Sequence, residues 1–172
     1  MSEQKKYEFT GKIKTIFGIE FKQIRAIISF GCVVAGEIGG WIECEENLSQ
    51  SGNAWVSGDA RVSGDAWVSG DARVYGNAWV SGDARVSGDA RVSGDARVKK
   101  DDDYMVIGGA GRYNRFTTFF KCRDKTIKVI CGCFFGTIIE FRAKVKETHK
   151  GNKHEKVYLA MADMAELQIG ND

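Results

Sequence analysis

SGNAWV (residues 51–56) opens a run of eight six-residue units that continues without an insertion to SGDARV (residues 93–98). Each unit reads x-Gly-Asp/Asn-Ala-Arg/Trp-Val, and the Ala and the final Val are the only apolar positions present in every copy. These two positions are therefore expected to face a core. Gly followed by Asp or Asn favours a tight turn, because both residues tolerate a positive φ. A corner every six residues predicts short strands that stack into a parallel β-helix.

The repeat resembles the hexapeptide-repeat superfamily of left-handed parallel β-helices, in which three units make one triangular coil. The resemblance covers residues 51–98 and implies a little under three coils. Stacked strands about 4.8 Å apart would then make a prism only about 13 Å tall. Such a prism is shorter than the β-helices on which enzymes of that superfamily are built.

The fifth position of each unit, Arg or Trp, forms a vertical pattern once the repeat is wound into coils. Residues eighteen apart are predicted to lie above one another, so that every Trp has Arg as its neighbour. The predicted stacks are Trp55 with Arg73 and Arg91, Arg61 with Trp79 and Arg97, and Trp67 with Arg85. A guanidinium on an aromatic ring is worth about 0.5–1 kcal/mol at exposed sites. Two interpretations stay open: the stacks only stabilise the prism, or Trp55, Trp67 and Trp79 form an interaction surface for a ligand or partner.

Residues 1–50 are predicted to form an N-terminal β cap on the repeat. Three stretches in this segment are rich in β-branched and aromatic residues: Tyr7–Phe9, Lys12–Phe17 and Ile19–Ile28. A β-helix needs caps of different sequence because its last strand is open to edge-to-edge pairing.

Residues 99–172 are predicted to form a small α+β domain of order β-β-β-α-α. Its expected strands are Tyr104–Ile107, Phe116–Cys122 and Thr126–Cys133, the last two joined as a hairpin. Thr137 and Glu140 match a capping box for the first helix, which is expected to end near His149. Asn152 and Glu155 can cap the second helix. The apolar stripes are predicted at Ile138, Phe141 and Val145, and at Val157, Met161 and Met164.

Composition and charge exclude several classes of protein. No apolar stretch approaches the ~20 residues that span a bilayer, and the first seven residues are too polar for a signal peptide, so we expect a soluble cytoplasmic protein without membrane contact. Five cysteines without a scaffold spacing are typical of reduced thiols. The net charge is +2, and residues 99–172 carry fourteen basic and ten acidic residues. This excess is too small to predict binding of duplex nucleic acid.

Taken whole, the chain resembles a group of small phage and prophage proteins with hexapeptide repeats. The resemblance depends on GGWIE (39–43) with Glu46-Asn47-Leu48, on GRYN (111–114), and on GCFFGT (132–137) with Glu147-Thr148-His149. It implies a phage origin, action in the host cytoplasm and a fold that tends to form homotrimers. It implies no established activity.

Enzymatic chemistry of the superfamily lacks its principal residues in this chain. The acyltransferases use a histidine of the β-helix as general base and the related carbonic anhydrases bind zinc through histidines, yet residues 51–98 contain none. Cys131 and Cys133, predicted on one side of a strand, form a set with His149 and His154 that superficially suggests zinc. The spacing differs from a structural site, and a helix between Cys133 and His149 would separate them by about 16 Å. We therefore expect no catalytic residue, no metal and no cofactor.

A glycine-rich stretch after the first C-terminal strand, IGGAGRYNR (107–115), is the candidate ligand site. Glycines let backbone N–H groups approach a ligand, arginines hold phosphate and tyrosine stacks on a base. The candidate residues are Gly109, Gly111, Arg112, Tyr113, Asn114 and Arg115. A plain loop between strands is the alternative, since the next segment is a strand and neither the dinucleotide fingerprint nor the P-loop is present.

The sequence thus favours a non-catalytic phage protein that sequesters a nucleotide signal of a host defence system as a homo-oligomer. A protein-interaction or structural role, with docking on a host or virion protein, is the alternative. An acyltransferase-like enzyme is a third and weaker hypothesis.

Overall fold

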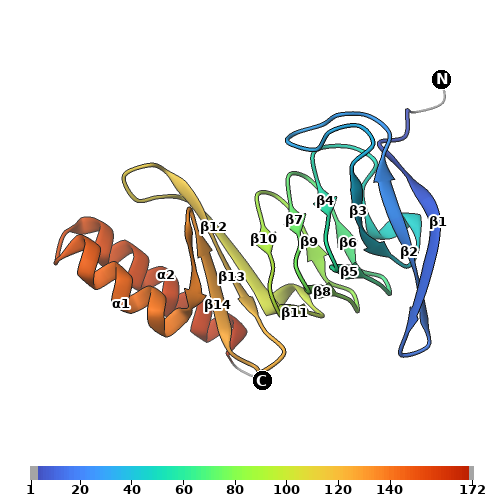
Figure 1. The fold of residues 1–172 in the computed structure, drawn as a ribbon. Helices are drawn as coiled ribbons and strands as arrows, with labels where there is room; N and C mark the ends of the chain where they lie inside the picture. The colour runs from blue at the N-terminus through green and yellow to red at the C-terminus, as the bar shows by residue number, and fades with distance from the viewer. Residues whose placement is uncertain (1–3, 171–172) are drawn as a thin grey trace. The chain divides into compact units, whose positions relative to one another are not determined.

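The computed structural model describes residues 4–170, which divide into two compact units. The first unit ends at Asp101 and the second begins at Asp102, and each is described by itself. The first unit consists of strands, and the second combines a sheet with two helices (Figure 1).

The eight hexads form eight two-residue strands, each made by the Arg or Trp and the Val of one unit. They are β4 (Trp55–Val56), β5 (Arg61–Val62), β6 (Trp67–Val68), β7 (Arg73–Val74), β8 (Trp79–Val80), β9 (Arg85–Val86), β10 (Arg91–Val92) and β11 (Arg97–Val98). The glycine of every hexad has a φ between 62° and 71°, which turns the chain at each corner. All the Ala and Val side chains of the repeat are at most 1% exposed, so they form the core as predicted.

These strands make the three faces of a parallel β-solenoid of about three turns (Figure 1). One face carries β5, β8 and β11, the second β4, β7 and β10, and the third β6 and β9. Trp55 pairs with Arg73 and Arg73 with Arg91, Trp79 lies between Arg61 and Arg97, and Trp67 pairs with Arg85. The predicted eighteen-residue register is confirmed on all three faces.

The N-terminal segment extends one of these faces. β1 (Tyr7–Ile16) and β2 (Ile19–Ala26) form an antiparallel hairpin, β2 pairs antiparallel with β3 (Ile38–Ile42), and β3 pairs parallel with β5. The sheet order is β1-β2-β3-β5-β8-β11. The two short strands predicted before Gly18 are one strand, since a register shift between Phe9 and Ile13 accommodates Gly11 at φ +88°.

The parallel stacking begins before the first hexad. Trp41 of β3 pairs with Arg61, and Leu48, after the short 3-10 helix η1 (Glu45–Asn47), bridges to Val68. Both spacings are twenty residues, so this coil carries two residues more than the eighteen of the regular coils.

Two buried polar side chains, Lys6 and Asn47, close the N-terminal end of the solenoid. Backbone carbonyls of each coil accept from the preceding coil, and in the first hexad coil those of Ala60, Val62 and Val68 accept from Trp41, Glu43 and Ser49. Other carbonyls of this coil accept from side chains instead. Lys6 Nζ lies 2.9 Å from the carbonyl oxygen of Ala54 and 3.4 Å from that of Gly52. Asn47 Nδ2 donates to the carbonyls of Gly64 and Ala66, each at 2.9 Å. These side chains replace a missing strand and leave little edge for another chain to pair with.

The second unit is a four-stranded antiparallel sheet with two helices. After the short 3-10 helix η2 (Asp101–Asp103) come β12 (Tyr104–Ala110), β13 (Arg115–Lys121), β14 (Ile127–Cys131) and β15 (Phe134–Thr137), which pair in that order. α1 (Ile138–His149) and α2 (Lys153–Ile169) follow, and their apolar sides share one core with the sheet. Phe119 and Phe141 contact edge to face at its centre, with ring centroids 5.7 Å apart.

The prediction of three C-terminal strands is wrong, because β15 is a fourth. Gly132 and Cys133 form a two-residue turn, with Gly132 at φ +60°, and Phe134 pairs back to Cys131. Cys131 and Cys133 therefore do not lie on one strand, and the prediction that they do is wrong. The four residues of β15 stand directly before the capping box, and they are too short to give a period-2 pattern.

The helix signals are confirmed at their termini. The Thr137 side chain accepts from the backbone N–H of Glu140 while the Glu140 carboxylate accepts from that of Thr137, and Asn152 caps α2. The apolar side of α2 differs from the prediction: Met161 is buried, but Met164 is 56% exposed. The buried side is completed by Tyr158, Ala162, Ala165 and Ile169.

Candidate functional site

A cavity of about 670 Å³ lies in the second unit, among the β12–β13 loop, the β14–β15 turn, α1 and the start of α2. Its long wall is one side of α1, where the lining residues follow helical spacing: Phe141, Lys144, Val145, Thr148 and His149. Cavities of this size are typical of small-molecule sites.

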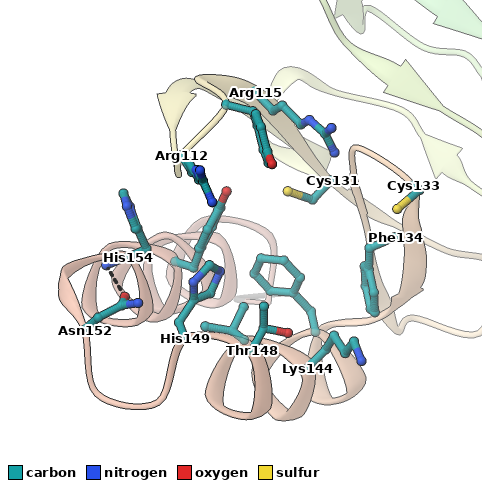
Figure 2. A pocket seen from close by; sticks show the side chains of 14 residues that line it. Arg112, Arg115, Cys131, Cys133, Phe134, Lys144, Thr148, His149, Asn152 and His154 are labelled. Atoms are coloured by element: carbon teal, nitrogen blue, oxygen red, sulfur yellow. Dashed lines mark hydrogen bonds between the residues drawn. The ribbon is translucent and has the colours of Figure 1, made fainter.

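The polar lining of the cavity is basic. Arg112 comes from the β12–β13 loop, Arg115 from the start of β13 and Lys144 from α1, and Figure 2 shows the two arginines across the cavity from α1. His149 and His154 add two imidazole rings to the lining. None of the described residues that line the cavity is Asp or Glu. The cavity therefore favours an anionic ligand.

Aromatic side chains supply the rest of the lining. Tyr113 is 68% exposed, and the guanidinium carbons of Arg115 and Arg112 lie 5.0 and 5.8 Å from its ring centroid. Phe134 and Phe141 pack against each other with centroids 5.5 Å apart. One planar ring at the rim and an apolar floor suit a flat heterocycle.

His149 and Tyr158 link the two helices at one end of the cavity. Their rings stack with centroids 5.4 Å apart, and the His154 ring lies 5.8 Å from that of His149. Burial raises the pKa of Tyr158 to about 12, the neighbouring Cys131 thiol adds to this, and Arg115 opposes it. The Tyr158 hydroxyl therefore stays protonated at neutral pH and can donate a hydrogen bond.

The structure brings Arg112, Tyr113 and Arg115 together on the cavity, but not the other three candidates from the glycine-rich stretch. Gly109 and Asn114 do not line it; Asn114 has a φ of +53° and completes the turn. Gly111 lies against the Tyr158 hydroxyl, leaving no space for a Cβ. These glycines shape the loop and let it approach α2, instead of presenting backbone groups to the cavity.

Lys144, Phe134 and Thr148 were missed as site residues. Their only signal in the sequence is position on a helix or next to a turn, where such residues are ordinary.

The thiols and imidazoles that suggested zinc all line this cavity: Cys131, Cys133, His149 and His154. Figure 2 shows Cys133 and His154 at opposite ends of the cavity. Within residues 4–170 no three His, Cys, Asp or Glu side chains are grouped so that they could hold a metal ion.

The three tryptophans of the repeat have different environments, which changes the predicted interaction surface. Trp55 is only 4% exposed, because Tyr7 and Phe30 of the cap pack against its ring, so it does not belong to an exposed surface. Trp67 is 42% exposed. Trp79 stacks parallel to Phe17 at 6.1 Å between ring centroids.

Comparison with known proteins identifies the repeat alone. Residues 54–70, 66–82 and 84–99 match the YdcK beta solenoid repeat, a family defined by a model of the repeat. These matches lie in the first unit and include no residue of the cavity. No curated protein matches the chain. Among residues 4–170, none of the helices has the length and apolar character needed to cross a bilayer.

Proposed function

We propose that the second unit binds a nucleotide through its phosphate and base and holds it without chemical change. The observation that carries the proposal is the lining of the 670 Å³ cavity, which combines three permanent cations with aromatic rings and, among the described residues, has no carboxylate. A nucleotide is the common metabolite class that joins a strong anion to a flat heterocycle.

The phosphate is assigned to Arg112 and Arg115. A guanidinium donates two parallel N–H bonds to an oxyanion, which is stronger than a bond between neutral groups. The N-terminus of α2 opens at the same cavity, so the positive end of its dipole adds to the attraction. The Asn152 side chain already accepts from the backbone N–H groups of His154 and Glu155 at 2.8 and 3.2 Å, so the helix contributes through its field.

The base is assigned to Tyr113 and the apolar floor. Stacking of a base on an aromatic side chain is worth about 1–3 kcal/mol. Tyr113 is held in place by the two neighbouring guanidinium groups, so little freedom is lost when a base stacks on it. Phe134 and Phe141 offer a second apolar contact.

The full form of the proposal is that of a phage protein that acts in the host cytoplasm, forms a homotrimer and sequesters a nucleotide signal of a defence system. It is supported by the resemblance of the flanking motifs to phage proteins and by the basic aromatic cavity. A monomer mass in size-exclusion chromatography with light scattering would contradict the trimer and leave the binding proposal standing.

Docking on a host or virion protein is the second candidate function. It is favoured by two exposed side chains of the first unit, Phe17 at 87% and Trp67 at 42%. Substitution of Arg112 separates the two functions, since it should abolish nucleotide binding and leave binding of a protein partner intact.

Calorimetric titration of the full chain tests the binding proposal, with ADP as the probe and adenosine as the probe without phosphate. ADP should bind, and adenosine should bind at least tenfold more weakly. Arg112→Ala should weaken ADP binding at least tenfold, the value of one lost charge-assisted hydrogen bond. Arg123→Ala is the matched control, because Arg123 is exposed between β13 and β14 and does not line the cavity.

Mass spectrometry of the denatured complex tests whether the ligand is unchanged. ADP should be recovered intact in stoichiometric amount after prolonged incubation. Recovery of AMP, adenosine or an acylated product would overturn sequestration, and equal affinity for ADP and adenosine would overturn the assignment of the cations to phosphate.

A further inference from the structure

Cys131 presents a thiol inside the cavity of the second unit, and neither proposed function uses it. The residue ends β14, is partly exposed and lines the cavity. Figure 2 shows its sulfur directed into the cavity. A small molecule that enters the cavity can therefore reach this sulfur.

Two buried hydroxyl groups are directed at the Cys131 sulfur. Thr117 is completely buried on the neighbouring strand β13, and its Oγ1 donates to Cys131 Sγ at 3.2 Å. Tyr158 is only 8% exposed, and its hydroxyl also hydrogen-bonds to the Cys131 side chain. A thiol sulfur is a weak acceptor, whereas the nucleophilic form of cysteine is the thiolate. Two buried donors on one sulfur therefore suit a cysteine that reacts.

The charge around this sulfur selects for an anionic reagent. The Arg115 guanidinium lies directly over Gly132, the residue that follows Cys131. None of the described residues that line the cavity is Asp or Glu. Reactive cysteines characteristically lie in such electropositive, partly exposed surroundings. A cleft of one charge also raises the local concentration of small ions of the opposite charge.

We infer that Cys131 is a modification site, at which a small disulfide that carries carboxylate groups forms a mixed disulfide with the protein. Arg115 holds a carboxylate of the reagent through its N–H groups. The Cys131 sulfur attacks one sulfur of the reagent and forms a new S–S bond with that half. The other half leaves as a thiolate and takes up the proton that the Cys131 thiol loses. Cys131 is oxidised and the departing half is reduced, so no further oxidant is needed.

Peptide mass spectrometry of the reduced full chain tests this site by following the modification of Cys131 with time. Glutathione disulfide is the carboxylated probe, and cystamine is the cationic probe. The same chain unfolded in urea gives the ratio of the two rates without a cavity. Folding should raise the ratio of the glutathione rate to the cystamine rate at least about tenfold, the lower end of electrostatic focusing in a charged cleft. Neither probe is a nucleotide, so a failure of ADP to bind leaves this test unaffected.

Two substitutions separate attraction of the reagent from reactivity of the sulfur. Arg115→Gln should slow the reaction with glutathione disulfide at least about tenfold and leave the reaction with cystamine no slower. Thr117→Val keeps the shape of the side chain but removes a donor to Sγ, so it should slow both reactions by the same factor, about fivefold. Arg123→Gln is the matched control, because Arg123 is exposed and does not line the cavity.

Cys133 provides the comparison within the same cavity. It is exposed in the β14–β15 turn, whereas Thr117 and Tyr158 direct their hydroxyls at Cys131. In Cys133→Ser, Cys131 should react at the wild-type rate, which excludes transfer from the more exposed thiol. The inference is overturned if Cys131 stays unmodified while Cys133 reacts, if folding leaves the ratio of the two rates unchanged, or if Arg115→Gln leaves the glutathione rate intact.

Discussion

The hydroxyl of Tyr158 occupies the space that a side chain at Gly111 would need, so the β12–β13 loop and α2 meet through a glycine. Gly111 has a φ of +73°, which L-residues with a side chain rarely adopt. This contact places Arg112, the next residue, at the cavity. Gly111 is therefore required for packing, and it affects a ligand only by positioning Arg112.

Gly111→Ala should destabilise the second unit by more than about 2 kcal/mol. The left-handed backbone costs about 1–2 kcal/mol with a Cβ, and displacement of Tyr158 adds to this. Gly109→Ala is the matched control: its φ is +74°, but a Cβ there would lie 3.5 Å from Asn114 Oδ1, an ordinary contact. Urea unfolding of both variants measures the difference, and equal losses would show that the overlap with Tyr158 carries no energy.

Gly132→Ala should weaken ADP binding about tenfold through the position of Arg115, since this is the value of one charge-assisted hydrogen bond. The Arg115 side chain lies directly over Gly132, and a Cβ would overlap its guanidinium. Gly151→Ala carries similar backbone strain at φ +83° with no atom within 4 Å of the added Cβ. Calorimetry should find unchanged affinity for the Gly151 variant; a loss of affinity there as large as in Gly132→Ala would contradict the role given to Arg115.

Lys6 should make the stability of the first unit rise with pH above about 8. Burial lowers the pKa of the Lys6 ammonium to about 8, whereas a lysine in the unfolded chain keeps its proton to about 10.5. Below pH 8 both states hold the proton; between 8 and 10.5 the unfolded state holds it more tightly, so the free energy of unfolding increases with pH.

The difference in unfolding free energy between wild type and Lys6→Met isolates this effect from other titrating groups. It should increase by about 1–2 kcal/mol between pH 7.5 and 9.5. A difference that is flat across this range would mean that the carbonyls of Ser51, Gly52 and Ala54 around Nζ stabilise the ammonium form as well as water does.

Asn47→Asp should destabilise the first unit by about 2–4 kcal/mol, although it changes a single atom type. The Asn47 amide nitrogen donates to the carbonyls of Gly64 and Ala66, and a carboxylate oxygen in its place would face two acceptors. Asn77→Asp is the control, because Asn77 is exposed and stands at the hexad position that most copies fill with Asp. Thermal unfolding should show a small shift for Asn77→Asp; a shift as small for Asn47→Asp would exclude a capping role.

Trp79→Ala should cost about 3–5 kcal/mol and Trp67→Ala about 1 kcal/mol or less. Trp79 lies between the guanidinium groups of Arg61 and Arg97 at 5.4 and 5.9 Å, and its Nε1 donates to Ser63 Oγ at 2.9 Å. Trp67 is exposed and should contribute less to the free energy of unfolding. Equal losses of stability in the two variants, measured by urea unfolding, would contradict this difference.

The solenoid was readable from the sequence because the period itself encodes the contacts. Once Gly and Asp fix a corner every six residues, the pairing of Trp55 with Arg73 follows from counting. The parallel pairings of Trp41 with Arg61 and of Leu48 with Val68 could not be predicted by counting. The paired residues are twenty positions apart, and no Gly-Asp corner precedes Trp41 or Leu48. The side chain of Asn47 caps the coil beside Leu48, and this role is visible only in three dimensions.

Only some of the residues that line the cavity could be predicted from the sequence. Arg112, Tyr113 and Arg115 are adjacent in sequence, and their chemistry marks them as a group. His149 and Lys144 join them only because α1 packs across the sheet, and polar residues on a helix ordinarily face water. Gly111 was predicted to contact the ligand, whereas the structure packs the Tyr158 hydroxyl against it. A glycine gives the same signal in the sequence whether a ligand or a tyrosine hydroxyl approaches its backbone.

The capped first coil fixes where the regular register of the solenoid begins. Lys6 and Asn47 cap the first coil, and every later coil has the same eighteen-residue length. Duplication of three hexads would therefore lengthen the solenoid by one coil and keep each Trp and Arg on its face. A single duplicated hexad would instead carry every following residue one face around the triangle. Changes of length in related genes should therefore come in steps of eighteen codons, with the one-hexad step removed by selection.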